Sequence, residues 1–582
     1  MNETILITTA ISETSSEENN VLYAGSWCFS YKKSEELKNK NLSVHSYHWD
    51  DRGKFYKDYI YVLKFIDEVV VNLSKCLNDF HNVNRDERYW KIILGPWLSF
   101  FIAAFFDRWS IIDEILEKRL ATKTYILNKK FKPPETITEY LSFVNNDYWN
   151  HYLFSQIISH YKNIEIVKIP SNEGKKIKRN FSWKQLIFRL LNSLPNFSHN
   201  KKFFFSTYPY LRLRSRFKLE IVLKQFPSIL FRHDVIRQKY NEELRNDLKR
   251  KFNSFESSNK FESCFYDLLS QFIPMAYLEG YCGNIEKISK IKWPKNPKVI
   301  FSANSHISDD FFKIWSAEMS CYGSKIYLIQ HGGFYGIGKI NLIEKIEKDI
   351  ADKFLSWGWT DNKTIAISSP LLLGSKKRIK HSDFGNGCLS IINTSIPRYA
   401  YSFYTMPIAG QFIHELDNQI KFVKNLSQEI YSKTYLKLYP NDYGFCQKER
   451  WSDNLKDLNF YNDSESVLKI FKNSRLIIHT YNATTFLESL ARNIPTILII
   501  NINYWELRDS AKEHMKKLSD MGIVHYEPLS AAKYINNIWH NLEAWWLEDK
   551  RQKAIDSFCN EFAKNDKNWI NTWISTMDLD NL

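Results

Sequence analysis

The sequence has few of the residues that mark disordered, disulfide-linked or membrane-spanning chains. Its 582 residues contain only 16 Pro and 18 Gly against 44% hydrophobic residues, which excludes a disordered, collagen-like or low-complexity chain. The eight Cys include no Cys-x-x-Cys pair, so neither a disulfide framework nor a zinc ribbon is indicated. The longest apolar run, 97–106, is short of the roughly 20 residues that span a bilayer. The first residues also lack the basic region of a signal peptide, so we expect a cytoplasmic protein.

Positive charge is concentrated in one window of the chain. Of the net charge of +15, residues 171–220 contribute ten positive charges, from 12 Lys and Arg against two Glu, and the cations alternate with aromatic residues. Such a window fits a solvated helical face, a surface for anionic lipid headgroups, or a nucleic-acid surface. Because no nucleic-acid-binding motif accompanies it, we expect no nucleic-acid partner; the inner face of the cytoplasmic membrane is the functional alternative to a solvated face.

The two halves of the chain differ in hydrophobic pattern. Residues 55–290 have mostly the spacing of long helices, after two short β-branched runs at 5–9 and 21–25. From about residue 298, short apolar runs alternate with helical segments. These runs are residues 298–303, 326–329, 353–356, 388–393, 434–438, 475–479 and 495–500. Strands that are apolar on both faces and separated by helices predict an α/β protein with doubly wound parallel sheets.

A polar, basic connector at 368–383 suggests a domain boundary. We predict a helix-rich N-terminal Rossmann-like domain at 1–375 that binds the acceptor, a C-terminal Rossmann-like domain at 376–530 that binds a nucleotide, and a helical tail at 531–582. The loops after the strands of two such domains would face a shared crevice, where ligands bind in open α/β sheets. The tail is rich in Trp, which we expect to anchor it to the body.

The clearest functional motif follows the apolar run 475–479. Hydroxyl and amide side chains, Thr480, Asn482, Thr484 and Thr485, stand between a strand and the start of a helix, where free N–H groups and the helix dipole attract an anion. One turn into that helix, Glu488 has the reach to accept the hydroxyls of a ribose attached to a bound phosphate. The structural alternative is that Thr484 or Thr485 merely caps the helix.

A glycine-rich loop, beginning Gln330-His331-Gly332-Gly333, follows the apolar run 326–329. Glycine permits close approach of the backbone to a ligand. The loop matches neither the Walker pattern nor the dinucleotide pattern. Between a buried strand and glycines, His331 is a hydrogen-bond donor or proton carrier rather than part of a known phosphate loop.

Three acidic residues are candidates for a catalytic carboxylate. Glu344 and Glu347 lie one helical turn apart, although an ordinary solvated face explains them equally well. Asp107 stands beside Arg108 after an apolar segment, so it is either a buried ion pair or a nucleophile.

Polar residues also follow other strands of the C-terminal half. Tyr439 and Pro440 come after the run 434–438, and Arg508 follows the run 495–500 and has the geometry to clamp a phosphate or carboxylate. No cluster of His, Asp or Glu has metal-ligand spacing in the sequence. We therefore expect chemistry without a metal or other cofactor.

The segment 475–495 resembles the nucleotide-sugar site of GT-B glycosyltransferases, which have two facing Rossmann-like domains. That resemblance implies that Thr480, Asn482, Thr484 and Thr485 hold the donor phosphate and that Glu488 binds the ribose. The whole chain is similar to a bacterial family of O-antigen and capsule transferases. The motifs are Thr8-Thr9-Ala10, 25–28, 94–97 with Asp107-Arg108, Gln330-His331-Gly332-Gly333, 356–359, Tyr439-Pro440, 481–488, 504–508 and Trp545-Trp546.

The resemblance implies an enzyme that moves an acidic sugar, pseudaminic acid first and Kdo next, from CMP onto a lipid-linked surface glycan, with retention. Its nucleotide contacts would include Gln330, Gly332, Gly333 and Arg508, together with Tyr439-Pro440, where several CMP-using enzymes have His-Pro. Phe334 replaces the third glycine of the usual loop.

Retention by two displacements needs a carboxylate nucleophile and an acid/base. Asp107, Glu344 and Glu347 are candidates for the first role and His331 for the second. The alternatives are a CDP-alcohol phosphotransferase, which would release CMP without transferring a sugar, and a non-enzymatic basic protein that binds a membrane or nucleic acid.

Overall fold

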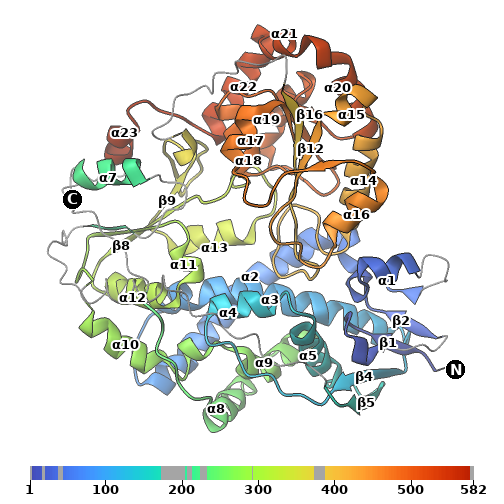
Figure 1. Cartoon of the computed structure of the whole chain (residues 1–582). Helices are drawn as coiled ribbons and strands as arrows, with labels where there is room; N and C mark the ends of the chain where they lie inside the picture. The colour runs from blue at the N-terminus through green and yellow to red at the C-terminus, as the bar shows by residue number, and fades with distance from the viewer. Residues whose placement is uncertain are drawn as a thin grey trace.

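Three parallel β-sheets covered by helices form the part of the chain that the structure describes (Figure 1). The computed structural model describes residues 3–15, 20–36, 43–171, 203–205, 213–222, 233–291, 293–372 and 387–576. The predicted α/β class with parallel, doubly wound sheets is therefore confirmed.

The first sheet is built from the N-terminal segment and has the order β3-β2-β1-β4-β5. Its strands are β1 (Ile5–Ile7), β2 (Val21–Tyr23), β3 (Ser43–Val44), β4 (Lys123–Leu127) and β5 (Glu165–Ile169). We predicted mostly helix over 55–290, which is confirmed for the described residues apart from three short strands, β4, β5 and β6 (Phe203–Phe205). Strands β4 and β5 have five residues each, and β4 pairs with β1, more than 100 residues earlier, which local spacing does not reveal.

The other two sheets follow the apolar runs of the sequence. The middle sheet has the order β10-β9-β8-β7-β6, and the C-terminal sheet the order β13-β12-β11-β14-β15-β16. The middle strands are β6 (Phe203–Phe205), β7 (Val299–Ser302), β8 (Lys325–Ile329), β9 (Lys353–Ser356) and β10 (Thr364–Ala366). The C-terminal strands are β11 (Cys388–Ile392), β12 (Thr434–Lys437), β13 (Asn459–Phe460), β14 (Ser474–His479), β15 (Thr496–Ile499) and β16 (Val524–His525).

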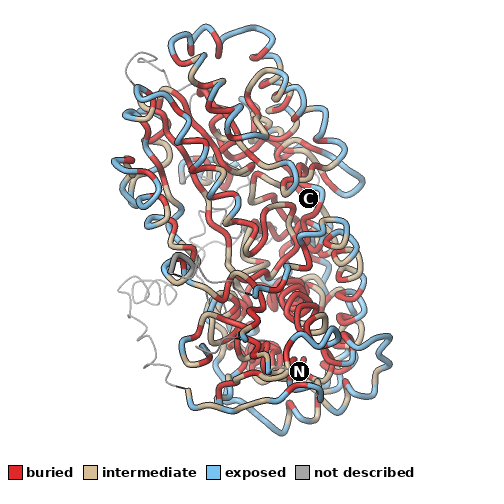
Figure 2. Tube along the Cα trace, turned by 90° about the vertical axis from the view of Figure 1, so that its right-hand side faces the viewer, coloured by how far each residue is buried: buried red, intermediate tan, exposed pale blue. Residues whose placement is uncertain are grey.

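Two long antiparallel helices lie beneath the middle and C-terminal sheets in Figure 1, with the first sheet at their right-hand end; they are α2 (Arg52–His81) and α3 (Glu87–Glu117). Among the described residues, α3 is the one helix with the length and composition to cross a membrane, but 94% of its most apolar window is buried inside the protein. Helix α3 therefore serves as a core helix. Figure 2 shows buried residues running through the interior of both lobes, the N-terminal lobe with the first and middle sheets and the C-terminal lobe with the C-terminal sheet.

The remaining helices cover the sheets. In the N-terminal part they are α1 (Tyr31–Glu36), α4 (Ile137–Phe143), α5 (Asp147–Ile158), α7 (Leu213–Val222), α8 (Glu242–Phe252), α9 (Lys260–Phe272), α10 (Tyr281–Lys290), α11 (Ser305–Ser308), α12 (Asp310–Cys321) and α13 (Leu342–Ile350). In the C-terminal part they are α14 (Gln411–Lys424), α15 (Gln428–Ser432), α16 (Gln447–Asn454), α17 (Val467–Asn473), α18 (Thr484–Ala491), α19 (Asp509–Asp520), α20 (Pro528–Ile538), α21 (Leu542–Trp546), α22 (Asp549–Phe562) and α23 (Trp569–Thr576).

The middle and C-terminal sheets form a GT-B arrangement, because loops from the carboxyl edges of the two sheets meet each other. The glycine-rich loop follows β8. The loop that contains Thr480, Asn482, Thr484 and Thr485, here the hydroxyl loop, follows β14. The first sheet is an addition to this pair. The predicted boundary at 375/376 falls in 373–386, outside the described residues, so the domain limits stay a prediction.

The C-terminal tail returns to the middle sheet. Trp573 in α23 is fully buried and donates a hydrogen bond from Nε1 to the Ser368 carbonyl over 2.9 Å. Gly358, after β9, has a φ of +138° and lies so close to α22 that a Cβ atom would stand 2.5 Å from the Glu561 carbonyl oxygen. Figure 1 shows α23 beside α7, apart from the other C-terminal helices. The tail thus fastens the two lobes together.

Candidate functional site

The glycine-rich loop and the hydroxyl loop are in direct contact. The Gly333 backbone N–H donates to Thr484 Oγ1 over 3.0 Å. A Cβ atom on Gly333 would stand 2.4 Å from the Thr484 nitrogen and 2.5 Å from the Ala483 carbonyl carbon, so only glycine fits against the start of α18. The structure therefore brings the two sequence motifs together at one place between the lobes.

The segment after the glycine-rich loop is also paired with the C-terminal lobe. Gly338 and Leu507 form an antiparallel bridge, and the Arg508 backbone N–H donates to the Ile337 carbonyl over 2.8 Å. Arg52 at the start of α2 donates to both oxygens of Glu506, over 2.7 and 2.9 Å. The segment after the glycine-rich loop is thus paired with residues 507 and 508 of the C-terminal lobe, and the neighbouring Glu506 is bound by Arg52 from the start of α2.

Helix α18 begins without a side-chain cap. Its N-cap residue is Ala483, and no side chain accepts a hydrogen bond there, which argues against Thr484 or Thr485 acting as a cap. The first backbone N–H groups of a helix have no partner within the helix. The start of α18 therefore has the features of an anion site, close to the Gly333 backbone.

Within the hydroxyl loop, Asn482 differs from its neighbours. Thr480 donates to Asn393 Oδ1 over 3.0 Å, and the Thr485 hydroxyl lies 2.8 Å from the Tyr481 hydroxyl. Asn482 is fully buried, yet neither atom of its amide has a hydrogen-bond partner. A buried amide without partners is costly, so a ligand that offers both a donor and an acceptor would satisfy it.

Glu488 lies one turn into α18 and is fixed by its own helix. Arg492 donates to Glu488 Oε1 from Nε and Nη2, over 3.0 and 2.7 Å. Arg492 also donates to the Leu371 carbonyl over 3.1 Å, which ties α18 to the end of the middle sheet. The carboxylate is therefore held in one orientation by Arg492, one turn farther along.

Gln330 shapes the glycine-rich loop from inside. Its side chain is fully buried, its Nε2 donates to the Gly332 carbonyl over 2.7 Å, and its Oε1 accepts from the Trp357 backbone and from Trp359 Nε1, each over 2.9 Å. With these partners filled, Gln330 positions Gly332 rather than facing a ligand.

His331 belongs to a compact cluster with His306 and Glu347. The Nε2 atoms of His306 and His331 lie 2.6 and 2.9 Å from Glu347 Oε1. The Tyr335 hydroxyl lies 2.7 Å from His331 Nε2, and Ser302 Oγ lies 3.0 Å from His306 Nδ1. Among the described residues, these two histidines and Glu347 have donor atoms within 4.8 Å of one another, close enough to hold a metal ion.

The electrostatics of the cluster follow from burial and from the two imidazoles. Burial alone would raise the pKa of the Glu347 carboxyl, but the charge and hydrogen bonds of His331 and His306 outweigh it and lower the pKa to about 2. Burial lowers the pKa of His306, although its hydrogen bond to Glu347 opposes the shift. Burial and the charge of Glu347 raise the pKa of Tyr335 well above its ordinary value.

Glu344 is buried and fully occupied. Its Oε2 accepts from the Gly336 backbone N–H over 3.1 Å, and its Oε1 accepts from Arg508 Nη2 over 2.8 Å. Glu344 and Arg508 therefore link α13 to the C-terminal lobe.

Asp107 is also occupied, and it lies away from the other candidates. Its Oδ1 accepts from the Tyr47 hydroxyl over 2.8 Å and lies 3.1 Å from His48 Nε2, while its Oδ2 accepts from Arg108 Nη1 over 2.8 Å. Helix α3 passes α13 at Gly95, where a Cβ atom would lie 3.4 Å from Ile346. Asp107 is twelve residues farther along, roughly 18 Å at helical rise. It forms the buried ion pair that the sequence left open.

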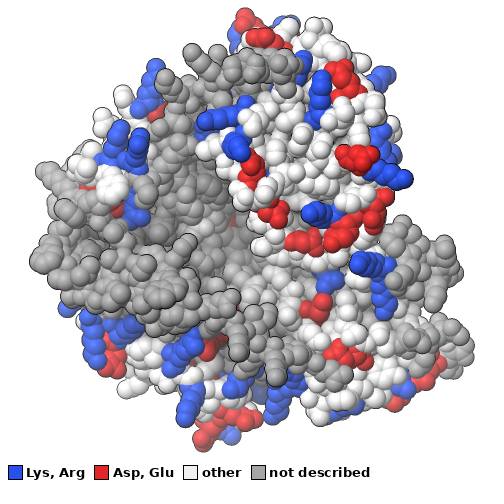
Figure 3. Space-filling model, viewed as in Figure 1, with Lys and Arg blue, Asp and Glu red and all other residues white. Residues whose placement is uncertain are grey.

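Tyr439 and Pro440 lie on the surface after β12. The Tyr439 side chain is 43% exposed, and its ring stacks on Tyr443 at 6.5 Å between centroids. Most of the basic window 171–220 lies outside the described residues, apart from 171, 203–205 and 213–220. On the face in Figure 3, Lys and Arg lie among Asp and Glu on the described surface.

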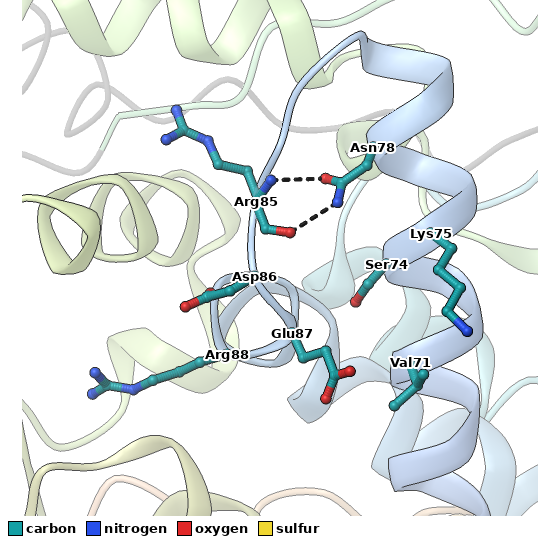
Figure 4. Close-up of a pocket in the computed structure, with 8 residues that line it drawn as sticks. All are labelled: Val71, Ser74, Lys75, Asn78, Arg85, Asp86, Glu87 and Arg88. Atoms are coloured by element: carbon teal, nitrogen blue, oxygen red, sulfur yellow. Dashed lines mark hydrogen bonds between the residues drawn. The ribbon is translucent and has the colours of Figure 1, made fainter.

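A separate cavity of about 500 Å³ lies between α2 and the first turn of α3 (Figure 4). It is lined by Val71, Ser74, Lys75, Asn78, Arg85, Asp86, Glu87 and Arg88. The Asn78 side chain bonds the backbone of Arg85 on both sides, at 3.1 and 2.8 Å, and so closes the turn between the helices. The cavity includes no residue that the sequence analysis named.

Two residues of the site, His306 and Arg492, were not predicted from the sequence. His306 comes just after β7, as His331 comes just after β8, and the two strands are parallel neighbours. The polar run 302–306 after a buried strand was the available signal. Arg492 stands four residues after Glu488, a spacing typical of a helical ion pair.

Solved structures resemble the chain only distantly. The S. aureus MnaA–UDP co-structure is 9% identical, with 79% of this chain and 97% of that chain covered and a TM-score of 0.32. A structure of WaaG, a glycosyltransferase involved in lipopolysaccharide biosynthesis, is 8% identical, with 64% and 97% covered and a TM-score of 0.29. Acinetobacter baumannii MurG is 11% identical, with 52% and 78% covered and a TM-score of 0.30. Scores this low carry no argument about substrate or site.

Among curated proteins, none matches the sequence. A family model described as LIC12162 family transferase matches residues 4–577.

Proposed function

The chain belongs to the LIC12162 family of transferases, and from that premise we propose that it is a glycosyltransferase that moves an acidic sugar from CMP to a surface glycan. One observation supports this above all: the uncapped start of α18 meets the Gly333 backbone between the two lobes, with the open amide of Asn482 beside it. We propose an anion site here, where the loops of two Rossmann-like halves meet.

In this proposal the phosphate of CMP binds at the start of α18. The N–H groups and dipole of the helix stabilise the negative charge that grows on the phosphate as the bond to the sugar breaks. Thr480, Asn482, Thr484 and Thr485 surround that position, and Glu488, oriented by Arg492, accepts the ribose hydroxyls.

The structure favours some of the catalytic candidates over others. Glu344 and Asp107 have all their oxygens engaged in buried contacts, so we assign them to holding the protein together. His331 belongs to the glycine-rich loop and lies 2.9 Å from Glu347, and its side chain is 18% exposed. We place the reacting bond on the His331 side of the cluster.

We further propose pseudaminic acid as the first donor sugar and Kdo as the second, transferred with retention to a lipid-linked glycan. The resemblance to O-antigen and capsule transferases supports this choice. An acidic sugar also brings its own carboxylate into the crevice, where it needs a cationic partner.

We propose that the protein works at the inner face of the cytoplasmic membrane, with α7 as a contact. Its exposed face combines the cations Arg214 and Lys218 with Phe217, Ile221 and Val222, which are 46%, 66% and 49% exposed. Cations beside apolar side chains suit anionic lipid. The protein should co-sediment with phosphatidylglycerol vesicles more than with phosphatidylcholine vesicles. Replacing Phe217 and Ile221 by Ser should reduce this; unchanged binding would contradict the assignment.

A thermal-shift series with CMP, CDP, UDP and GDP tests the nucleotide assignment. CMP should give the largest rise in Tm. A ligand at a hundred times its Kd stabilises the folded protein by about 2.7 kcal/mol. A larger rise with UDP or GDP, or no rise with any nucleotide, would contradict the proposal. The largest rise with CDP would instead favour a CDP-alcohol phosphotransferase.

A further inference from the structure

We propose that His306, His331 and Glu347 form a site for one transition-metal ion of the zinc class. Both Nε2 atoms approach the same oxygen, Glu347 Oε1, at 2.6 and 2.9 Å, and all three donor atoms lie within 4.8 Å of one another. Two imidazoles and one carboxylate are a ligand set that zinc uses in catalytic sites, where a fourth position stays open.

The backbone holds these ligands in place before any ion binds. Strands β7 and β8 are parallel neighbours, and each is followed at its carboxyl end by one of the histidines. Glu347 comes from α13, which packs against α3 and against both β8 and β9. Three elements of the core therefore fix the three side chains, as a preorganised metal site requires.

A second observation points to a missing ligand. Glu347 is only 1% exposed, and its second oxygen, Oε2, is buried without a hydrogen-bond partner. A buried carboxylate oxygen with nothing to bind is costly, and a cation bound by both oxygens of Glu347 would remove that cost.

The surroundings of His306 also suit a metal ligand. Ser302 Oγ lies 3.0 Å from His306 Nδ1, on the far side of the ring from Glu347. Histidines that bind a metal commonly have such a partner on the second nitrogen, which fixes the orientation of the ring.

The open position would lie on the side of His331, the most exposed of the three side chains. Two residues farther on, Gly333 touches the start of α18. There the ion would act as a Lewis acid toward a phosphate or carboxylate oxygen of the substrate. This last step rests on the proposed function, whereas binding of the ion does not. The sequence predicted chemistry without a metal, because residues 306, 331 and 347 lie too far apart in the chain to form a metal-binding motif. The proposed site departs from that prediction.

Metal content and titration test the site. The full chain is stripped with a chelator and titrated with Zn²⁺ and, for its visible absorption, with Co²⁺. We expect about one ion per chain, with the Co²⁺ spectrum of a four-coordinate N/O site. Glu347→Gln and His306→Ala should each weaken binding by at least about tenfold.

His45→Ala is the matched control. His45 is a buried histidine that also pairs with a glutamate, Glu114, at 3.4 Å, but among the described residues this pair is not part of a group of three metal ligands within 4.8 Å of one another. This variant should bind the ion as the parent does. A thermal melt of each variant establishes that it is folded, and Glu347→Gln, which keeps the size of the side chain, covers the case in which His306→Ala does not fold.

Two results would overturn the site: uptake of less than about a tenth of an ion per chain, or equal binding by the parent, Glu347→Gln and His306→Ala. The cluster would then be a set of hydrogen bonds alone. The CMP thermal shift, repeated on stripped protein, separates the two proposals. Metal binding without any CMP shift would contradict the nucleotide assignment and support the metal site. A CMP shift without metal binding would support the nucleotide assignment and contradict the metal site.

Discussion

Glu344 and Glu347 lie one turn apart on α13, both buried, yet their surroundings differ. Glu344 has both oxygens filled, one by Gly336 and one by Arg508 from the other lobe. Glu347 has two imidazoles on one oxygen and nothing on the other. The same residue type on the same helix thus serves two purposes, and the difference lies in whether the protein itself completes the hydrogen bonds.

The contrast extends to the contact between the glycine-rich loop and the start of α18. Thr484 accepts from Gly333 and is part of the contact between lobes, whereas Asn482, two residues earlier, is buried with an open amide. Polar groups that have hydrogen-bond partners within the protein hold the lobes together. Buried polar groups without partners mark the place where we expect a ligand to bind. Four substitutions test this division through the free energy of unfolding, and they are ordered by the expected size of that effect.

Glu344→Ala should have the largest effect. It leaves Arg508 without its buried carboxylate and Gly336 without an acceptor, for a loss of about 3 kcal/mol in chemical denaturation. Lys345→Ala, the next residue of the same helix, breaks only a partly exposed pair with Asp349 and should cost less than about 1 kcal/mol. Equal losses for the two variants would refute the assignment of Glu344 to the contact.

Gly333→Ala should come next. The new methyl group would overlap the backbone of residues 483 and 484, so the lobes must separate slightly, at about 1–3 kcal/mol. Gly332→Ala is the matched control, because its Cβ atom would meet only the Tyr335 ring at 3.4 Å. If Gly332→Ala destabilises the protein as much as Gly333→Ala, the contact with α18 is not what requires glycine.

Glu415 also has one carboxylate oxygen without a hydrogen-bond partner, but its neighbours are Asn501 and Asn418 rather than imidazoles. Burial raises its pKa to about 7, with opposing hydrogen bonds from Asn501 and Asn418. A folded-state pKa above the unfolded value of 4.5 means that stability falls as pH rises from 4.5 through 7. Glu415→Gln should therefore gain about 1–2 kcal/mol relative to the parent between pH 6 and pH 8. Parallel stability curves for the two proteins would exclude this titration.

Asn482→Leu should have the smallest effect on the free protein. It replaces a buried amide without partners by an apolar side chain of similar size, so stability should change by less than about 1 kcal/mol or increase. The rise in Tm on adding CMP should nevertheless disappear. A CMP shift of parental size in this variant would show that the open amide does not face the nucleotide.

Much of the fold was visible in the sequence. The seven apolar runs of the second half became β7, β8, β9, β11, β12, β14 and β15 within one or two residues, because buried parallel strands are continuous and apolar. Strands β4, β5 and β6 escaped notice because they lie in a stretch of mostly helical spacing. The pairing of β4 with β1 and of β5 with β4 is something that no local pattern records.

The site was only partly predictable for the same reason. Both loops were found because each directly follows a strand. The cluster was not, since the sequence does not show that β7 and β8 are neighbours or that α13 returns Glu347 to both histidines. Nor does it separate Glu344 from Glu347, because the partner of Glu344 is Arg508, 164 residues later.

A crystal structure of the protein with CMP tests the central claim most directly. We predict that the phosphate lies at the start of α18, within about 3 Å of the amide nitrogen of Asn482. CMP bound elsewhere, such as in the cavity between α2 and α3, with Asn482 still without a partner, would contradict the account.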